Sequence, residues 1–181
     1  MSCISNLRVV NLFALMSLLA APAFAGWRDD SGAAQLTGSG RATWFGIPLY
    51  EARLWAGAPP SLDRSFALEL TYLRAFRRTA LVEESISEMV RLNGDVDPRT
   101  RAQWIEQMNH AFADVTKGDR MIGVFLPDSG TRFYHNDQMT AEIHDPLFAR
   151  LFFAIWLSPN TRVPGLRNAL LGNALPARTW P

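Results

Sequence analysis

The sequence predicts an α+β fold in which one antiparallel sheet packs against helices. Three observations indicate this class: strand patterns come first, two amphipathic helix patterns follow, and closely spaced strands then precede a strongly apolar helix. Because the strands and helices are grouped and do not alternate, we expect an antiparallel sheet and not a series of βαβ units. No repeat or low-complexity segment indicates a second domain.

Residues 1–25 are typical of a secretory signal peptide. Arg8 precedes an apolar run from Val9 to Leu19, and the sequence Ala23-Phe24-Ala25 fits the small-residue rule for cleavage. The apolar run is shorter than the ~20 residues that a transmembrane helix needs, so we expect no stable membrane span after the signal is removed. We therefore predict export, cleavage after Ala25, and a single domain over residues 26–181.

The composition excludes several classes of function. The only cysteine, Cys3, lies in the predicted signal, so no disulfide is expected in the exported chain. That chain would carry 17 basic and 17 acidic residues without a basic stripe, which argues against a nucleic-acid partner. His110, His135 and His144 lack metal-ligand spacing, and we predict no metal site and no cofactor.

The first strands are predicted from apolar patterns. Residues 43–55 are apolar on both pleat faces, with Gly46 and Pro48 expected to kink a single strand, and Gly38-Ser39-Gly40 is predicted to form the turn before it. Residues 66–73 alternate and predict a half-buried strand.

Two helices are predicted next. Thr79 is expected to cap the first, which ends at Asn93-Gly94, and Asp97-Pro98 begins the second. The residues expected to face the core are Val82, Ile86, Met89 and Val90 in the first helix, and Trp104, Ile105, Met108 and Phe112 in the second. Glu83, Glu84 and Glu88 are interpreted as a solvated face, with general acid–base work as the alternative.

A meander and two more helices complete the prediction. Strands are expected over residues 120–126, 131–135 and 138–143, joined first by the turn 127–130. Asp145-Pro146 predicts the start of a helix that is apolar almost all round and hence buried, and Ser158-Pro159 ends it. A short helix is predicted from Pro164 to Leu171.

The residues alone indicate a pocket and no reaction. No GxSxG motif or cysteine nucleophile is present. Arg41, Tyr50 and Arg53 lie in a region dense in aromatic rings, and a guanidinium beside a phenol suits a carboxylate or phenolate. The alternative is that Arg53 pairs with Glu51 or Glu69 at the surface while Tyr50 packs in the core.

Four stretches together resemble the bacterial, exported branch of the chalcone isomerase-like family. They are GSGRATWFGIPLYEARLW, ALELTYLRAF, GDRMIGVFLPDSGTRFYHND and DPLFARLFFAIWLSPNTR, and the similarity covers about residues 36–172. The resemblance implies an open-faced β-sandwich, an antiparallel sheet with helices packed on one face, and it favours the periplasm. Plant members close chalcones into flavanones without a cofactor, using an arginine with Thr, Tyr and Asn side chains, and other members bind fatty acids through an Arg and Tyr pair.

Carrying the family's site onto this chain gives six candidate ligand-binding residues. Arg41 and Tyr50 would hold an anionic head group, and Trp44, Phe45 and rings of the buried helix would line the apolar tail. The plant threonine falls at Phe45, and the tyrosine and asparagine fall near Leu81 and Glu88, so three of the four polar catalytic positions are substituted.

We therefore expect a non-catalytic binder of a small hydrophobic or amphipathic acid, for example a fatty acid. One alternative is a cofactor-free isomerase, an intramolecular lyase acting on a chalcone-like or other enone, in which Arg41 alone would stabilise an enolate. Another is an accessory protein whose pocket is filled by its own side chains, such as Trp44, Phe45 and Leu81. The sequence identifies no protein partner.

Overall fold

The computed structural model describes residues 26–172 except 33–34 and 58–60; the predicted signal sequence lies outside the described residues. The described part contains six strands and five helices. In chain order these are α1 (Trp27–Asp30), β1 (Gln35–Trp44), β2 (Ile47–Ala56), β3 (Phe66–Tyr72), α2 (Arg78–Asn93), α3 (Pro98–Ala111), β4 (Arg120–Leu126), β5 (Gly130–His135), β6 (Gln138–Ile143), α4 (Pro146–Leu157) and α5 (Pro164–Leu171).

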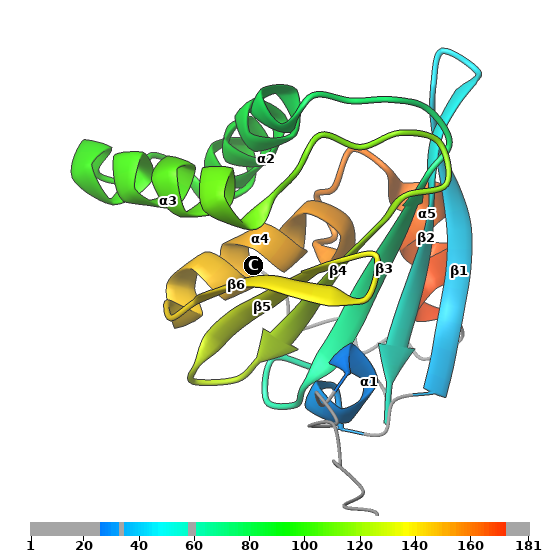
Figure 1. The fold of residues 1–181 in the computed structure, drawn as a ribbon, viewed down its shortest axis with the longest axis horizontal. Helices are drawn as coiled ribbons and strands as arrows, with labels where there is room; N and C mark the ends of the chain where they lie inside the picture. The colour runs from blue at the N-terminus through cyan, green and yellow to red at the C-terminus, as the bar shows by residue number, and fades with distance from the viewer. Residues whose placement is uncertain (1–25, 33–34, 58–60, 173–181) are drawn as a thin grey trace, which may run out of the picture.

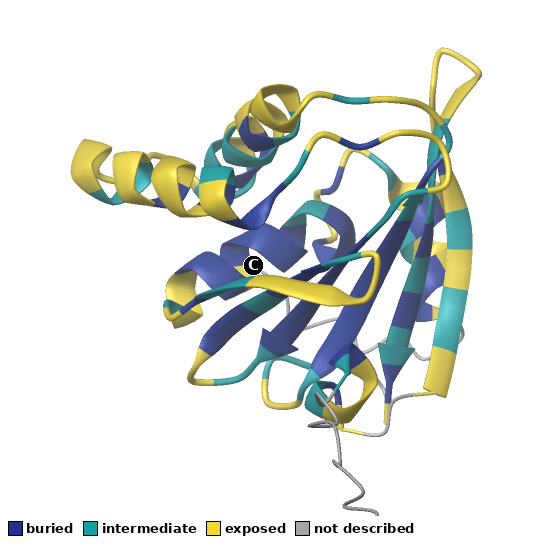
Figure 2. Cartoon of the chain, in the orientation of Figure 1, coloured by how far each residue is buried: buried dark blue, intermediate teal, exposed yellow. Residues whose placement is uncertain are grey.

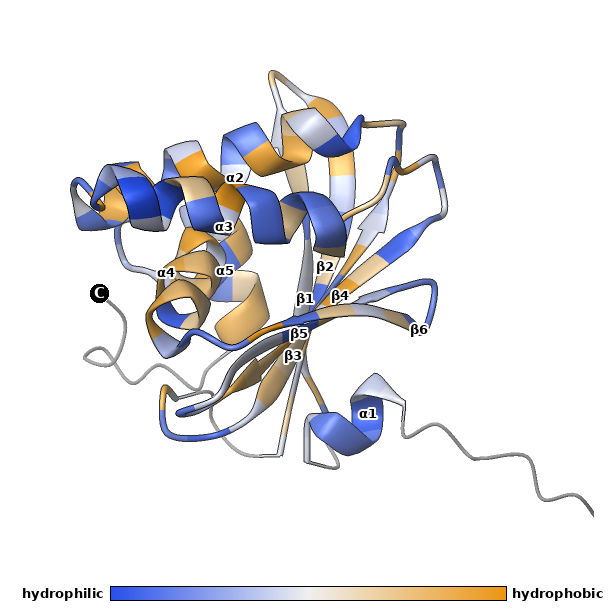
Figure 3. Cartoon of the chain, turned by 60° about the vertical axis from the view of Figure 1, so that its left-hand side comes forward, coloured by the Kyte–Doolittle hydropathy of each residue, from blue (hydrophilic) through white to orange (hydrophobic). Residues whose placement is uncertain are grey.

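The six strands form one open sheet in which each strand pairs antiparallel with the next along the chain. Helices α2 to α5 lie on one face, and only the four-residue α1 lies on the other (Figures 1 and 3). The predicted α+β class and the open-faced β-sandwich are therefore confirmed.

The centre of the core is the apolar helix α4, which lies between the sheet and α2 (Figure 2). Phe148, Phe152 and Phe153 are buried and pack against rings of the strands, including an edge-to-face contact of Phe153 with Phe66 at 5.0 Å between ring centroids. Asp145 caps the helix by accepting hydrogen bonds from the backbone N–H groups of Leu147 and Phe148, as its sequence predicts. The buried helix and the meander before it are confirmed.

The stretch predicted as one kinked strand is a hairpin. β1 and β2 meet at a two-residue turn, in which Phe45 and Gly46 both have positive φ, 47° and 78°. Two central residues of this conformation match the twist of the paired strands and give a tight hairpin. Gly46 adopts a positive φ without strain, but phenylalanine is unusual in this conformation. For this reason the sequence did not predict a turn at Phe45.

The predicted turn at Gly38-Ser39-Gly40 is wrong, because these residues lie inside β1. A Cβ atom on Gly38 would lie 2.2 Å from the carbonyl oxygen of Ala169, and one on Gly40 would lie 2.8 Å from Leu166 Cδ1. Both glycines therefore permit the close approach of α5 to the edge of the sheet.

Three further expectations are corrected. The strand β3 is buried on both faces and not half-buried, because Trp27 of α1 packs in one buried cluster with Ala67, which points to the outer side of the strand. Ile105 is exposed on α3, while the other residues expected to face the core on that helix are buried. Thr79 does not cap α2, since the N-cap position is Arg77 and the Asp114 carboxylate accepts the backbone N–H of Arg78 at 2.8 Å.

Helix α2 is held away from the sheet. It packs mainly on α3 and α4, while α4 and α5 contact the strands directly. Space therefore remains between α2 and the strands β1 to β4 at the end of the sheet that α4 does not fill. None of the described helices is long and apolar enough to cross a membrane.

Candidate functional site

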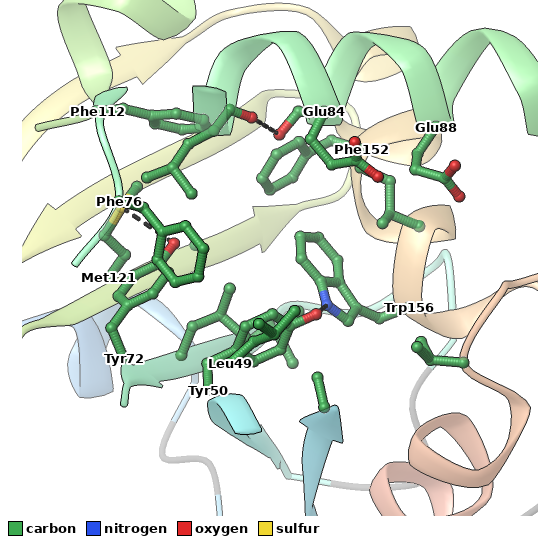
Figure 4. A pocket seen from close by; sticks show the side chains of 18 of the residues that line it. Leu49, Tyr50, Tyr72, Phe76, Glu84, Glu88, Phe112, Met121, Phe152 and Trp156 are labelled. Carbon is green, nitrogen blue, oxygen red and sulfur yellow. Dashed lines mark hydrogen bonds between the residues drawn. The ribbon is translucent and has the colours of Figure 1, made fainter. Parts of the chain in front are cut away.

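A cavity of about 620 Å³ lies between α2 and the strands (Figure 4). Its volume falls within the range of small-molecule sites. Most of its lining is apolar or aromatic. The residues that line it are Ala42, Thr43, Trp44, Leu49, Tyr50, Leu68, Leu70, Tyr72, Phe76, Ala80, Leu81, Glu84, Ser85, Glu88, Phe112, Met121, Ile122, Gly123, Phe133, Phe152, Phe153, Ile155, Trp156, Thr161, Arg162 and Val163.

Small residues on the strands keep the floor of the cavity open. Ala42 of β1 and Gly123 of β4 line it, and a Cβ atom on Gly123 would lie 3.1 Å from the ring of Phe153. Larger side chains at these positions would fill part of the space or push the buried ring away. The cavity is therefore a consequence of both the raised α2 and the small side chains below it.

A tyrosine and a tryptophan meet inside the cavity. The indole Nε1–H of Trp156 donates a hydrogen bond of 3.0 Å to the Tyr50 hydroxyl (Figure 4). Burial raises the pKa of Tyr50 above its ordinary value, and the nearby carboxylates of Glu84 and Glu88 raise the pKa further. The phenol therefore keeps its proton, and among the described residues no acceptor engages that O–H.

A second polar group of the lining is a cluster of charged residues around Glu88. The Glu88 side chain is buried, 6% exposed, and its carboxylate lies 2.8 Å from Arg91 Nη2 and 3.0 Å from Arg162 Nη1. Arg91 also donates to the backbone oxygen of Asn160, and its hydrogen bond with Glu88 raises the pKa of Arg91. One carboxylate is thus shared by two guanidinium groups, which leaves one positive charge in the cluster.

Of this cluster, Glu88 and Arg162 line the cavity, and Arg162 is the exposed one. Its side chain is 54% exposed and lines the cavity, and its only acidic partner among the described residues is Glu88. Five N–H groups are available on a guanidinium, so most of those on Arg162 remain free for a ligand. Glu84 is exposed, also lines the cavity and lies on the same helix as Glu88, so it adds one negative charge to the lining (Figure 4).

Four of the six predicted site residues lie together in this lining. Trp44, Tyr50, Leu81 and Glu88 face the cavity, as do Phe152 and Trp156 of the predicted buried helix. The expectation of a solvated Glu88 is wrong, because the side chain is buried between two arginines. The roles of these four residues in ligand binding stay predictions.

The structure places Arg41 and Phe45 outside the cavity lining. Side chains alternate along β1, so Ala42 points inward and Arg41 points to the outer face, where its Nη2 lies 2.6 Å from Glu51 Oε1. Phe45 is 89% exposed at the hairpin turn. On the same outer face Arg53 lies 3.8 Å from Glu51 and 3.9 Å from Glu69, which is the surface pairing that the sequence left as an alternative.

Sequence reasoning did not single out Arg162, Trp156 or Ser85. Arg162 follows the helix stop at Ser158-Pro159 and lies in no periodic pattern, so only the chain's return toward α2 brings it to Glu88. Trp156 was expected only as one ring of a buried helix. Its indole N–H could have been taken as a sign of a polar partner, because a buried tryptophan N–H usually has one.

The chemistry of the lining suits binding of a molecule with an apolar body and an acceptor at one end. The polar groups are hydroxyls, a guanidinium and carboxylates. In the described part of the chain, no three side chains of His, Cys, Asp and Glu come close enough to hold a metal ion.

Comparison with known proteins identifies the family. A family model described as chalcone isomerase-like matches residues 34–172. The fold is similar to the crystal structure of a fatty-acid binding protein from Arabidopsis thaliana, with a TM-score of 0.61 and 12% identity over 79% of this chain and 89% of that one. No curated protein matches the sequence at a significant level. Because the family model spans most of the sequence, this chain belongs to the chalcone isomerase-like family.

Proposed function

We propose that the protein binds a small amphipathic acid, such as a long-chain fatty acid, in the cavity and does not convert it. The observation that carries this proposal is an apolar cavity of about 620 Å³ whose lining includes the protonated phenol of Tyr50 and the partly exposed Arg162. The fold similarity to a fatty-acid binding protein supports the same class of ligand.

The phenol of Tyr50 gives the head group a fixed donor. Its oxygen already accepts from Trp156, so the orientation of the hydroxyl is constrained and its proton points away from the indole. An oxygen acceptor on the ligand would satisfy this buried donor, and a ligand without an acceptor would leave it unpaired at a cost of about 1–3 kcal/mol.

Arg162 supplies the positive charge that an acid requires, in place of Arg41. Arg91 already compensates the buried Glu88, so the guanidinium of Arg162 can turn its remaining N–H groups toward a ligand carboxylate. The exposed Glu84 opposes this attraction, and we expect its removal to raise the affinity for acids.

The placement of the candidate catalytic groups favours binding over cyclisation. The Arg41 guanidinium, which the isomerase alternative would use to stabilise an enolate, is engaged with Glu51 on the outer face. Leu81, near which the resemblance places a tyrosine of the plant enzymes, lines the cavity and cannot position substrate or water by a hydrogen bond. The open volume beside Tyr50 also favours an external ligand over a pocket filled by the chain's own side chains.

We further propose that the protein acts in the periplasm after export. The proposal rests on the predicted signal sequence of residues 1–25. Fractionation of cells that produce the full chain tests it: mature protein with Gly26 at its N-terminus in the periplasmic fraction is expected, and uncleaved protein in the cytoplasm would contradict it.

Native mass spectrometry followed by titration tests the binding function. The purified protein is expected to carry a molecule of fatty-acid mass that organic extraction removes. After extraction, it should bind a long-chain acid more tightly than the alcohol of the same length, because only the acid offers a charge to Arg162. A bare chain in the spectrum together with no saturable binding of long-chain acids would overturn the proposal.

A chalcone control separates the isomerase alternative. The rate of chalcone loss in the presence of the protein should equal the rate in buffer. A faster rate that Arg41→Ala abolishes would favour the isomerase and contradict the binding function as stated here.

A further inference from the structure

The β1–β2 hairpin ends in an exposed apolar tip beside the cavity. Trp44, Phe45 and Ile47, called the hairpin tip below, are 59%, 89% and 49% exposed. Trp44 and Phe45 contact edge to face, with their ring centroids 5.1 Å apart. These two rings pack on each other but leave most of their apolar surface in water, and an exposed apolar patch of this kind is typical of a contact surface.

A cluster of positive charges lies along the same end of the molecule. Arg74, Arg77 and Arg78, called the basic edge below, are exposed in the loop after β3 and at the start of α2. The backbone N–H of Leu73 donates to Leu49 of β2 at 2.9 Å, which ties this loop to the base of the hairpin. Figures 1 and 3 both show the hairpin end and this loop on one side of the molecule.

The charges of the basic edge are not neutralised by ion pairs with the described acids. The Asp114 carboxylate accepts a hydrogen bond from the backbone N–H of Arg78, and the Asp119 carboxylate accepts hydrogen bonds from Thr116 and Asn136. Neither carboxylate forms an ion pair with a side chain of the basic edge. Lys117 is exposed on the neighbouring loop, which the Phe76 and Val115 bridge holds against the first. Three arginines and a lysine therefore face solvent beside the apolar tip.

We infer that this end of the molecule docks on a lipid bilayer that contains anionic phospholipids. Tryptophan and phenylalanine side chains insert favourably at the boundary between head groups and acyl chains, and arginines bind the phosphates of anionic lipids. Charge complementarity selects this occupant, because an apolar tip flanked by unpaired cations lacks the acidic half that self-association of this surface would require.

Docking in this orientation would bring cavity-lining residues of the hairpin close to the bilayer. Trp44 belongs both to the hairpin tip and to the lining of the cavity, next to Thr43 and Leu49. An amphipathic molecule could then pass between the membrane and the cavity without crossing bulk water. The docking itself does not depend on the identity of the ligand, so it can be tested whether or not the cavity binds an acid.

Sedimentation with vesicles tests the inference. The purified protein is mixed with vesicles of phosphatidylcholine alone or with a minority of phosphatidylglycerol. We expect binding to the anionic vesicles that weakens with added salt. Replacing the three arginines of the basic edge with glutamine should lower the partition coefficient on the order of a hundredfold, since each arginine near an anionic surface contributes roughly fivefold.

The tip variant is Phe45→Asn with Ile47→Thr. Asparagine tolerates the positive φ of position 45, threonine suits a strand, and neither position lines the cavity, so the fold and the binding of an acid should be unchanged. Binding to anionic vesicles should fall at least tenfold. A matched control replaces two exposed apolar residues elsewhere, Met139→Thr with Leu147→Gln, and should bind as the unaltered protein does.

A second control replaces Arg99, Arg101 and Arg150 with glutamine, which removes the same charge at other positions of the surface. Equal binding of the basic-edge variant and this control would overturn the inference, as would equal binding to both kinds of vesicle. A concentration-dependent dimer in sedimentation equilibrium that the tip variant abolishes would assign the tip to a second copy and also overturn it.

Discussion

The two faces of the first three strands differ in how their polar groups are used. On the outer face Arg41, Glu51 and Arg53 pair with one another, and Arg120 and Arg53 share the buried Glu69. On the inner face Tyr50 keeps an unpaired proton inside an apolar cavity. Alternation along a strand sends neighbouring residues to these two faces, so adjacent positions in the sequence have different tasks.

This difference teaches that paired charges and a free donor have separate roles. The outer charges satisfy each other and maintain the sheet where only the short α1 covers it. The inner hydroxyl and the Arg162 guanidinium retain hydrogen-bonding capacity that a ligand can use. Substitutions on the outer face should therefore change stability, and substitutions on the inner face should change affinity.

Filling the cavity should have the largest effect. Ser85 lies on α2 and lines the cavity, and Ser85→Phe would place a ring in the space that the acyl chain needs. We expect the affinity for long-chain acids to fall more than about a hundredfold, while overpacking lowers the free energy of unfolding by at most about 1–3 kcal/mol. Titration and thermal unfolding of the same sample check both. Undiminished affinity would mean that the acid binds elsewhere.

Removing the buried charge of the outer face should have the next largest effect, on stability alone. Glu69 is 2% exposed, accepts from Trp55 Nε1 at 3.0 Å and lies 3.2 Å from Arg120 Nη1. Glu69→Gln leaves the guanidinium groups without that charge, and we expect a loss of about 2–3 kcal/mol in the free energy of unfolding. Denaturant unfolding measures it. A tenfold loss of acid affinity in the folded variant would break the distinction between the faces.

Tyr50→Phe should give a smaller and opposite pattern. The substitution keeps the ring but removes the hydroxyl, which is the proposed donor to the ligand and the acceptor for Trp156 Nε1–H. Acid affinity should therefore fall about tenfold, close to the value of one hydrogen bond to a charged group. The free energy of unfolding should change by less than about 1 kcal/mol, because the lost bond lies in a cavity that is already partly open. Affinities equal to those of the unaltered protein would show that the hydroxyl does not contact the ligand.

The smallest expected effect is a pH-dependent change in stability from the outer-face pair of Arg41 and Glu51. The hydrogen bond from Arg41 holds the pKa of Glu51 below its ordinary value. Stability from this pair is therefore present above the unfolded pKa of about 4.3 and is lost as the pH falls through the lower folded value. Glu51→Gln should lower the melting temperature slightly at pH 7, and the difference should shrink as the pH falls below about 4. A difference that does not shrink in acid would contradict this assignment.

Much of the fold was predictable from local patterns. The meander of β4 to β6 and the helices α4 and α5 begin and end close to where turn residues, caps and apolar runs place them. Each of these signals acts within a few residues: Asp145 caps its own helix, and residues 127–130 close their own turn.

The remaining features depend on contacts between distant segments. Glycines 38 and 40 read as a turn because nothing local shows that α5 will lie against them. Glu88 looked like a surface residue because its partner Arg162 lies 74 positions away along the chain. Tyr50 correctly placed the site on β2. The face on which Arg41 lies depends on the register of the β1–β2 hairpin. That register could not be predicted, because phenylalanine is an unusual residue at the turn position that Phe45 occupies.

The most direct test of the account compares Arg162→Gln with Arg41→Gln in titrations with a long-chain acid and the alcohol of equal length. Both variants lose one exposed positive charge, but only Arg162 lines the cavity. We predict that Arg162→Gln lowers the affinity for the acid about tenfold and leaves that for the alcohol unchanged, consistent with loss of a charge-assisted hydrogen bond. Arg41→Gln should alter neither affinity and cost less than about 1 kcal/mol of stability. Loss of acid affinity in Arg41→Gln with none in Arg162→Gln would contradict the account.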